Sequence, residues 1–397
     1  MTSLIRMTIA RTIRETLFQL ALAASLLGTL PGAGFRSTAG EPPRVASVLQ
    51  PFVDSHALAG AVTLVAAKDK VLSLEAVGYA DLAARKPMRT DALFWIASES
   101  KPMTVTALMM LVDEGKVNLA EPVEKYLPEF RGQMVAVEQD AEHQLLRKAN
   151  RPITVKDILS HTSGLPFGSR VEPKIDQHPL SEAVISYALT PLNSQPGTRY
   201  QYSNAGVNTA GRIIEVVSGI PYEVFMEQRL FKPLGMNDTT LWPSKSQLER
   251  LAKSYKPNAS KTDLEETDIT QLTCPLDDRR RGPSPAGGYF STAQDMARFG
   301  QMLLNGGELD GKRYVSAEAI REMTRKQTGD AIKDNYGLGF SVGGSSFGHG
   351  GAYSTHLGID TQRQLVTVFM VQHAGYAGAD GPKILPAFMK AAEAFAQ

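Results

Sequence analysis

Apolar and polar positions follow different periods in different parts of this chain. Five apolar residues recur at helical spacing and predict an amphipathic helix: Val45, Val48, Leu49, Phe52 and Val53. Two Val- and Leu-rich segments, 61–67 and 71–80, flank the turn-like residues 68–70 and predict a β-hairpin. Residues 103–117 are apolar nearly all round and include Gly115, a typical helix-ending residue, so we expect a buried helix there.

The middle of the chain, from about residue 116 to 290, has mostly helical periodicity interrupted by Pro and Gly turns. Within it, residues 215–236 predict two short helices joined at Gly219-Ile220-Pro221. Residues 129–150 are polar and charged, and we interpret them as an exposed insertion. A further helix is predicted to start at Ser291 or Thr292 and to end before Gly306.

Strand-like pieces interspersed with glycine return near the C-terminus, at 336–342, 347–360 and 364–372, and a terminal helix is predicted over 382–396. The pattern predicts an α+β fold, in which one antiparallel sheet is built from both chain ends and flanked by the N- and C-terminal helices. The sheet region covers about 41–115 and 291–397, and a mostly helical region is inserted between its halves. We expect a cleft where the two regions meet.

Composition is typical of a globular protein with a large core: of 397 residues, 43% are hydrophobic and 21% are charged. A formal net charge of +1 gives no electrostatic reason to expect a nucleic-acid or anionic-membrane partner. The run Arg279-Arg280-Arg281 is interpreted as a solvated loop, with contact to an acidic ligand as the alternative.

The cysteine and histidine content limits which disulfides and metal sites the chain can form. Cys274 is alone, so the chain forms no internal disulfide, and the seven histidines have no helical pair spacing typical of a zinc site. The sequence therefore implies neither a metal nor an organic cofactor.

The first forty residues differ from the rest. Three arginines, Arg6, Arg11 and Arg14, precede an apolar run over 17–30 and the breaker-rich residues 31–34, which predicts a signal peptide and linker over 1–40. We expect export to the periplasm or beyond and no membrane span in the mature chain. An uncleaved N-terminal anchor is the alternative. No cysteine lies near the end of the run, which excludes a lipoprotein anchor.

The segment 94–103 contains Ser98 and Lys101 in an S-x-x-K spacing at the start of the predicted buried helix. Residues three apart lie on one face of a helix, so the two side chains can meet there. A serine hydroxyl becomes a nucleophile when a base lies within hydrogen-bond reach, and a lysine of lowered pKa can be that base. The alternative is a helix-capping serine followed by a surface lysine.

Two further motifs follow in order: Tyr202-Ser203-Asn204 and His349-Gly350-Gly351. With the stretches 158–166, 230–239 and 287–299, they make nearly all of the mature chain resemble the serine hydrolases of the β-lactamase and penicillin-binding-protein superfamily. The branches that it resembles are the class C β-lactamases, their related esterases, the D-alanyl-D-alanine carboxypeptidases and the D-aminopeptidases.

The resemblance implies that Ser98 is acylated and that Lys101 is its proton partner. Tyr202 would act as a phenolate base that returns its proton to the leaving group, and Asn204 would offer its amide to the substrate carbonyl. The backbone N–H groups of Ser98 and Ala352 would form the oxyanion hole.

The third motif departs from the Lys-Thr-Gly of β-lactamases and many transpeptidases. Here His349 and Gly350 stand where the cation and the hydroxyl would be, beside Gly351 at the strand edge. A largely neutral histidine and a glycine weaken recognition of a substrate carboxylate. We therefore expect an ester or a small amide as substrate. The alternatives are a D-alanyl-D-alanine carboxypeptidase or D-aminopeptidase, a weak β-lactamase, and a non-catalytic penicillin- or peptidoglycan-binding protein.

A second serine motif competes with Ser98. Residues 344–348 match G-x-S-x-G around Ser346, and Asp360 and His373 follow in the order of an α/β-hydrolase triad. That motif needs a strand, a turn and then a helix, whereas strand-like sequence flanks Ser346 on both sides. We interpret 344–348 as a loop between two strands.

Overall fold

The structure is a computed structural model that describes residues 44–169 and 174–396. These residues belong to one compact unit, Pro43–Gln397. The predicted signal peptide, residues 1–40, lies outside the described residues. Within the described ranges, no helix has the length and apolar character needed to cross a membrane.

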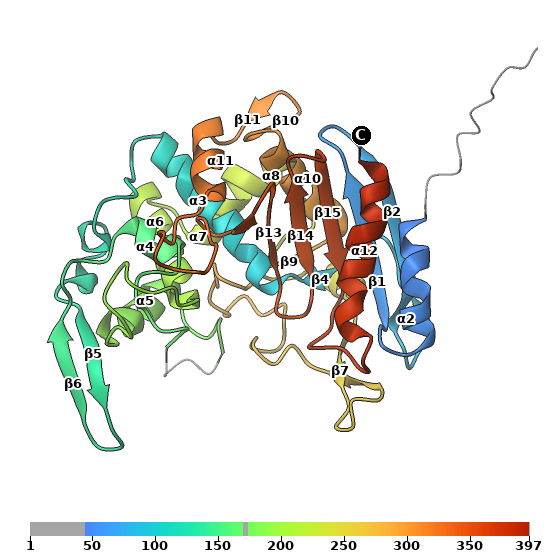
Figure 1. Cartoon of the computed structure of the whole chain (residues 1–397), viewed down its shortest axis with the longest axis horizontal. Helices are drawn as coiled ribbons and strands as arrows, with labels where there is room; N and C mark the ends of the chain where they lie inside the picture. The colour runs from blue at the N-terminus through green and yellow to red at the C-terminus, as the bar shows by residue number, and fades with distance from the viewer. Residues whose placement is uncertain (1–43, 170–173, 397) are drawn as a thin grey trace, which may run out of the picture. The chain divides into compact units, whose positions relative to one another are not determined.

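A seven-stranded antiparallel sheet joins the two ends of the chain (Figure 1). Its order is β12-β13-β14-β15-β1-β2-β3, so the N-terminal hairpin pairs with the C-terminal strands through β1 and β15. The strands are β1 (Gly60–Ala66), β2 (Val71–Asp81), β3 (Lys86–Pro87), β12 (Ser341–Gly343), β13 (Ser346–Gly350), β14 (His356–Asp360) and β15 (Leu365–Met370). The predicted sheet topology is confirmed.

The terminal helices pack together against this sheet. The N-terminal segment forms a 3-10 turn, η1 (Val45–Leu49), and the short helix α2 (Gln50–Asp54), and the C-terminal helix is α12 (Ile384–Ala392). Buried residues of η1, α12, β1 and β15 form one apolar cluster, in which the rings of Phe369 and Phe388 stack at 5.4 Å. The predicted flanking helices are therefore present, and they hold both chain ends against the sheet.

Helix α10 (Ala293–Leu304) packs against β1, β14 and β15 as part of a separate, larger core. Thr292 caps its start by accepting from the Asp295 N–H, as the sequence predicts. Gly300 lets the helix approach the sheet closely, because a Cβ there would lie 2.5 Å from Val366.

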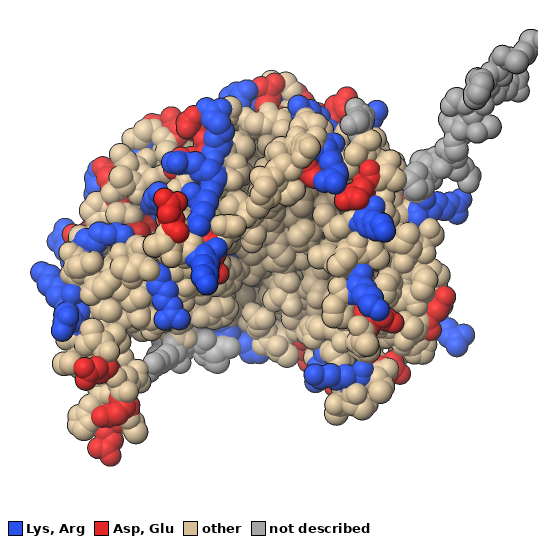
Figure 2. Space-filling view, in the orientation of Figure 1, with Lys and Arg blue, Asp and Glu red and all other residues tan. Residues whose placement is uncertain are grey.

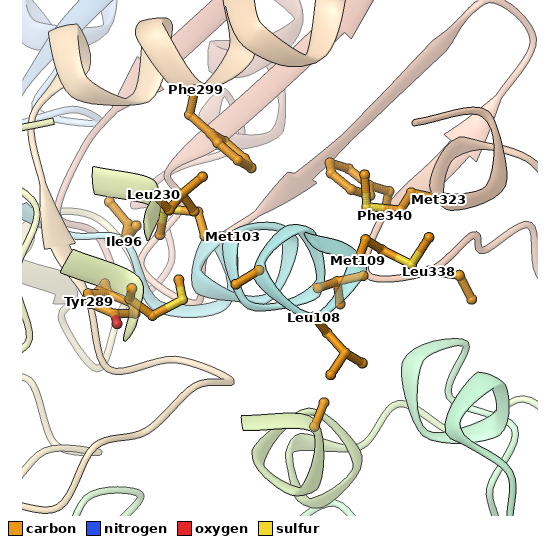
Figure 3. Packing of buried hydrophobic residues seen from close by; sticks show 14 of the residues in the cluster. Ile96, Met103, Leu108, Met109, Leu230, Tyr289, Phe299, Met323, Leu338 and Phe340 are labelled. Carbon is orange, nitrogen blue, oxygen red and sulfur yellow. The ribbon is translucent and has the colours of Figure 1, made fainter. Parts of the chain in front are cut away.

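Helix α3 (Ser100–Asp113) lies at the centre of the larger core (Figure 3). Every residue from Ser100 to Leu111 is buried, which explains why its sequence is apolar nearly all round. Met103, Leu108 and Met109 pack among side chains from several distant segments, among them Leu230, Phe299, Met323 and Phe340. Packing on all sides fixes the start of α3, where Ser98 and Lys101 lie.

The inserted region holds short helices and two additional hairpins. The helices are α4 (Val155–Leu159), α5 (Leu180–Leu189), α6 (Asn204–Ser218), α7 (Tyr222–Met226), α8 (Lys232–Leu234) and α9 (Lys245–Leu248). The hairpins pair β5 (Met134–Gln139) with β6 (Gln144–Lys148), and β7 (Ser254–Pro257) with β8 (Leu264–Thr267). The expected exposed insertion, 129–150, is thus largely a projecting hairpin (Figure 1). The division of the chain at residues 116 and 290 stays a prediction.

Three local predictions are wrong. Segment 347–360 forms two strands, because residues 351–355 turn back between β13 and β14. Of segment 336–342, only Ser341 and Val342 lie in a strand, β12. Arg281 is 4% exposed and forms an ion pair with the equally buried Asp176, so it is no part of a solvated loop. Arg279 and Arg280 are exposed, as expected.

Charges of both signs alternate over the face drawn in Figure 2, which has no large patch of one sign. This distribution agrees with the net charge of +1. Neither sign therefore dominates the field over that face.

Candidate active site

A cleft of about 430 Å³ brings the three sequence motifs together. Its walls come from the start of α3, the loop that precedes α6, and the end of β13. The described residues that line it are Trp95, Ala97, Ser98, Phe167, Ile175, Tyr200, Tyr202, Asn204, Gln271, Ala286, Gly287, Tyr336, Ser341, His349, Gly350, Gly351 and Ala352.

Ser98 lies on a tight turn at the entrance to α3. The residue before it, Ala97, has a left-handed φ of 46°, a conformation that costs a non-glycine residue about 1 kcal/mol. A 3-10 turn over Ala97–Glu99 then leads into the helix at Ser100. This geometry leaves Ser98 partly exposed in the cleft, while its neighbours on both sides are buried.

Lys101 faces Ser98 from the next turn. Its Nζ lies 3.0 Å from Ser98 Oγ and donates to the Ala286 carbonyl oxygen at 2.7 Å. Lys101 is fully buried, and burial lowers the pKa of its amine well below the ordinary value. The alternative of a surface lysine is excluded by this burial.

Tyr202 completes the group around Ser98. Lys101 Nζ lies 4.6 Å from the centre of the Tyr202 ring. Burial raises the pKa of the Tyr202 hydroxyl, and a hydrogen bond with the Ser98 side chain opposes this rise. The raised pKa favours the phenol over the phenolate in the resting site, and the phenolate role implied by the resemblance stays a prediction.

His161 holds the Tyr202 loop in place. The Ser203 N–H donates to His161 Nδ1 at 3.1 Å, and Ser203 also caps α6 by accepting from Gly206. The fully buried His161 ring lies 4.5 Å from the Tyr202 ring, centre to centre. Burial, and then the charge of Lys101, lower the pKa of His161 well below its ordinary value, so it is a neutral support.

Asn204 begins α6 and presents its amide to the cleft. Its backbone N–H donates to the Phe167 carbonyl at 2.8 Å, which ties the helix start to the cleft wall. The Asn204 Oδ1 atom is buried and accepts no hydrogen bond from the described residues. An unpaired buried acceptor in a cleft is suited to a ligand donor.

Both ring nitrogens of His349 are already engaged. Nδ1 donates to the Gly350 carbonyl at 2.8 Å, so Nε2 is the acceptor for the Tyr336 hydroxyl at 3.0 Å. Burial, and to a smaller extent the charge that Lys101 carries when protonated, lower the pKa of His349 to about 3. His349 is consequently neutral and offers no cation to a substrate carboxylate.

The end of β13 packs directly on the Ser98 turn. A Cβ on Gly351 would lie 2.2 Å from Thr355 Oγ1 and 2.6 Å from the Ile96 carbonyl oxygen, so only glycine fits there. Ala352, the next residue, is exposed and lines the cleft. Gly351 thereby sets how closely the backbone of Ala352 approaches the Ser98 turn.

The competing serine motif lies elsewhere. Ser346 begins β13 and pairs with Asp360 across the sheet, and residues 344 and 345 form the turn from β12. Asp360 is paired with Arg363, and His373 Nε2 accepts from the Ala59 N–H. The predicted loop is therefore limited to residues 344 and 345, since Ser346–Gly348 belong to strand β13, and no helix follows the serine as the α/β-hydrolase motif requires.

The Beta-lactamase family profile matches residues 45–385 of the chain, a span that contains all three motifs. The chain belongs to the Beta-lactamase family. It is a serine hydrolase of this family.

Relatives of this Beta-lactamase family member include a mycobacterial protein, an esterase and a hydrolase of solved structure. Protein Rv1367c of Mycobacterium tuberculosis is 34% identical over 359 residues, which cover 81% of this chain and 87% of that protein. Esterase EstB of Burkholderia gladioli is 33% identical over 208 residues, covering 49% of this chain and 50% of EstB. The solved structure of EstCE1, a hydrolase with promiscuous acyltransferase activity, superposes with a TM-score of 0.75 at 21% identity, covering 88% of this chain and 97% of that one.

A second hollow of about 430 Å³ lies between α12 and strands β12–β15. Figure 2 shows this face as a hollowed surface with few charges. None of Ser98, Lys101 and Tyr202 lines it. The cleft at Ser98 is therefore the candidate active site of this Beta-lactamase family member.

Two residues that support the cleft were missed by sequence reasoning. His161 and Tyr336 each hold a motif residue in place, yet no local pattern distinguishes them from packing residues. The segment 274–285 joins Gln271 to Ala286, which both line the cleft. No described residue of 129–150 lines it.

Proposed function

We propose that this protein is an esterase that hydrolyses uncharged carboxylic esters with short acyl chains through an acyl-enzyme on Ser98. The observation that carries the proposal is the 3.0 Å approach of a fully buried Lys101 amine to Ser98 Oγ. A neutral amine at this distance can accept the serine proton.

The proposed proton transfers use the lowered pKa of Lys101 and the raised pKa of Tyr202. Ser98 Oγ attacks the ester carbonyl while its proton passes to Lys101 Nζ, whose lowered pKa favours the neutral amine beforehand. The Tyr202 phenol then protonates the leaving alkoxide and recovers a proton from Lys101. In the second half, water attacks the acyl carbon, gives its proton to this pair, and Ser98 leaves as the free hydroxyl.

The developing oxyanion needs donors that point into the cleft. By resemblance, the backbone N–H groups of Ser98 and Ala352 take this role, and both residues line the cleft. Asn204 Oδ1, which is unpaired among the described residues, is available to a donor of the substrate.

The chemistry of the walls supports an uncharged substrate. No described residue that lines the cleft is an Asp, Glu, Lys or Arg, and His349 is neutral with both nitrogens engaged. A buried substrate charge without a partner loses several kcal/mol of solvation. Carboxylate substrates of a D-alanyl-D-alanine carboxypeptidase or a β-lactamase, and the ammonium of a D-aminopeptidase substrate, therefore have no charged partner here.

We also propose that the protein is exported, on the strength of the arginine-flanked apolar run in residues 1–40. Fractionation of cells that produce the full chain tests this directly. N-terminal sequencing of the processed protein would identify the cleavage site.

The test of the proposed activity is a substrate panel with purified mature protein. p-Nitrophenyl butyrate, a D-alanyl-D-alanine peptide and a penicillin are compared by kcat/KM. The butyrate ester is expected to exceed both anionic substrates by at least about a hundredfold, because two lost charge-assisted contacts amount to about 3 kcal/mol. A higher kcat/KM for the peptide would contradict the esterase proposal.

A further inference from the structure

Glu99, the residue after Ser98, is a fully buried carboxylic acid. It does not line the cleft. Neither of its carboxyl oxygens has a hydrogen-bond partner within normal distance among the described residues. A buried carboxylate with no partner is strongly unfavourable, so the neutral acid is the form that this site accommodates.

The Thr355 hydroxyl, in the turn between β13 and β14, is close enough to Glu99 to lower the pKa of its carboxyl group, against the larger, opposite effect of burial. Thr355 is itself buried, and its hydroxyl contacts the Ile96 carbonyl at 3.5 Å. The Thr355 carbonyl accepts from the Gly351 N–H at 2.8 Å. Glu99 and Thr355 therefore lie on the two segments that present Ser98 and Ala352 to the cleft.

Among the described residues, no charged group shifts the pKa of Glu99. Lys101 is directed to Ser98 and Ala286, Tyr353 donates to the Asp268 carbonyl, and His373 accepts from Ala59. None of these groups, nor His356 at the start of β14, contributes to the pKa of Glu99.

We propose that Glu99 is a positioning residue, which in its neutral form braces the turn over residues 351–355 against the Ser98 turn and so fixes the spacing of the two oxyanion donors. This inference rests on the proposed function, because it assumes that Ser98 and Ala352 stabilise an oxyanion. Ionisation of Glu99 would place an unpaired charge between the two turns and disturb that spacing.

The inference predicts that activity falls at alkaline pH because Glu99 ionises. Burial raises the pKa of Glu99 to about 8, so about nine tenths of it is ionised at pH 9. The wild-type kcat for p-nitrophenyl butyrate should fall about tenfold between pH 7 and pH 9.

Glu99→Gln provides the test, because the amide keeps the shape and cannot ionise. The variant should retain kcat within about threefold of wild type at pH 7 and should lack the alkaline fall. Lys101 and Tyr202 titrate in both proteins, so the difference between the profiles isolates Glu99. Circular dichroism at each pH checks that both proteins are folded.

Superimposable profiles would overturn the inference. A kcat more than tenfold below wild type at pH 7 in a folded Glu99→Gln would also overturn it. The ionised carboxylate would then be the form of Glu99 that supports catalysis.

A readout independent of activity separates this inference from the proposed function. Infrared difference spectra of wild type against Glu99→Gln at pH 7 should contain the C=O stretch of a protonated carboxylic acid, and that band should disappear by pH 9.5. Its absence at pH 7 would overturn the inference even if the esterase activity is correct. If instead Ser98→Ala remains active, the proposed function fails while the band still reports the state of Glu99.

Discussion

The Tyr336 hydroxyl lies 3.0 Å from Nε2 of His349 and donates to it, because Nδ1 of the same ring donates to a backbone carbonyl. This hydrogen bond helps to determine the charge of His349 in the third sequence motif, His349-Gly350-Gly351. The histidine is held as a neutral tautomer by two hydrogen bonds and by burial, so it does not replace the lysine of β-lactamases.

His349→Lys should shift substrate preference towards anions. A lysine amine in the cleft can form a charge-assisted hydrogen bond to a substrate carboxylate, worth about 2 kcal/mol. The ratio of kcat/KM for a p-nitrophenyl hemisuccinate to that for the butyrate should rise at least about tenfold. His349→Gln serves as the uncharged control, and an unchanged ratio in both variants would contradict the electrostatic account.

Lys101 should govern the acid side of the pH profile. Because the neutral amine accepts the Ser98 proton, kcat/KM should rise with pH through the lowered pKa of Lys101, until the alkaline fall expected from ionisation of Glu99 sets in. Lys101→Met should lose about 10² to 10⁴ in kcat/KM.

Lys101→Arg is the sharper variant of the same prediction. Arginine keeps a positive charge but does not deprotonate, so it should be about as inactive as Lys101→Met. If Lys101→Arg kept more than a tenth of the wild-type kcat/KM, Lys101 would be an electrostatic group and not a base.

Glu99 should also affect stability in a pH-dependent way. Its pKa is raised from 4.5 in the unfolded chain to about 8 in the fold. Between these values the unfolded chain releases a proton that the fold retains, so stability falls as pH rises through this window and the penalty is constant above pH 8. Urea unfolding of Glu99→Gln should therefore show a gain on the order of 3 kcal/mol at pH 7 that vanishes near pH 4.5. An equal gain at both pH values would contradict this linkage.

Arg281 should be essential for the segment that carries one wall of the cleft. Its Nε lies 2.7 Å from Asp176 Oδ2, both side chains are at most 2% exposed, and Asp176 also accepts from the Thr273 N–H. Arg281→Met leaves the Asp176 charge buried and should lower the free energy of unfolding by about 3–5 kcal/mol. Arg280→Met, at the exposed neighbouring position, is the control, and equal losses in both variants would contradict the account.

The parts of the site that local spacing determines were predictable. Ser98 and Lys101 lie on one helical face, and the structure has them 3.0 Å apart. Alternating apolar segments at both chain ends were sufficient to predict the antiparallel sheet, because strand pairing must bury one face. Tyr202 and His349 came from the resemblance alone, and the structure brings both into the cleft.

The rest depends on pairs far apart in sequence. Arg281 looks like its neighbours Arg279 and Arg280, and its burial follows from Asp176, which is 105 residues away. His161 supports Ser203 across 42 residues. The polar partners of these side chains leave no periodic signal, so only the folded chain reveals them.

The most direct measurement is intact-protein mass spectrometry after rapid quenching with p-nitrophenyl butyrate, followed by peptide mapping of the adduct. The account predicts a butyryl group on Ser98 that accumulates transiently in wild type and is absent from Ser98→Ala, with Ser346→Ala labelled as wild type. A butyryl group on any other residue, or turnover by Ser98→Ala at the wild-type rate, would contradict it.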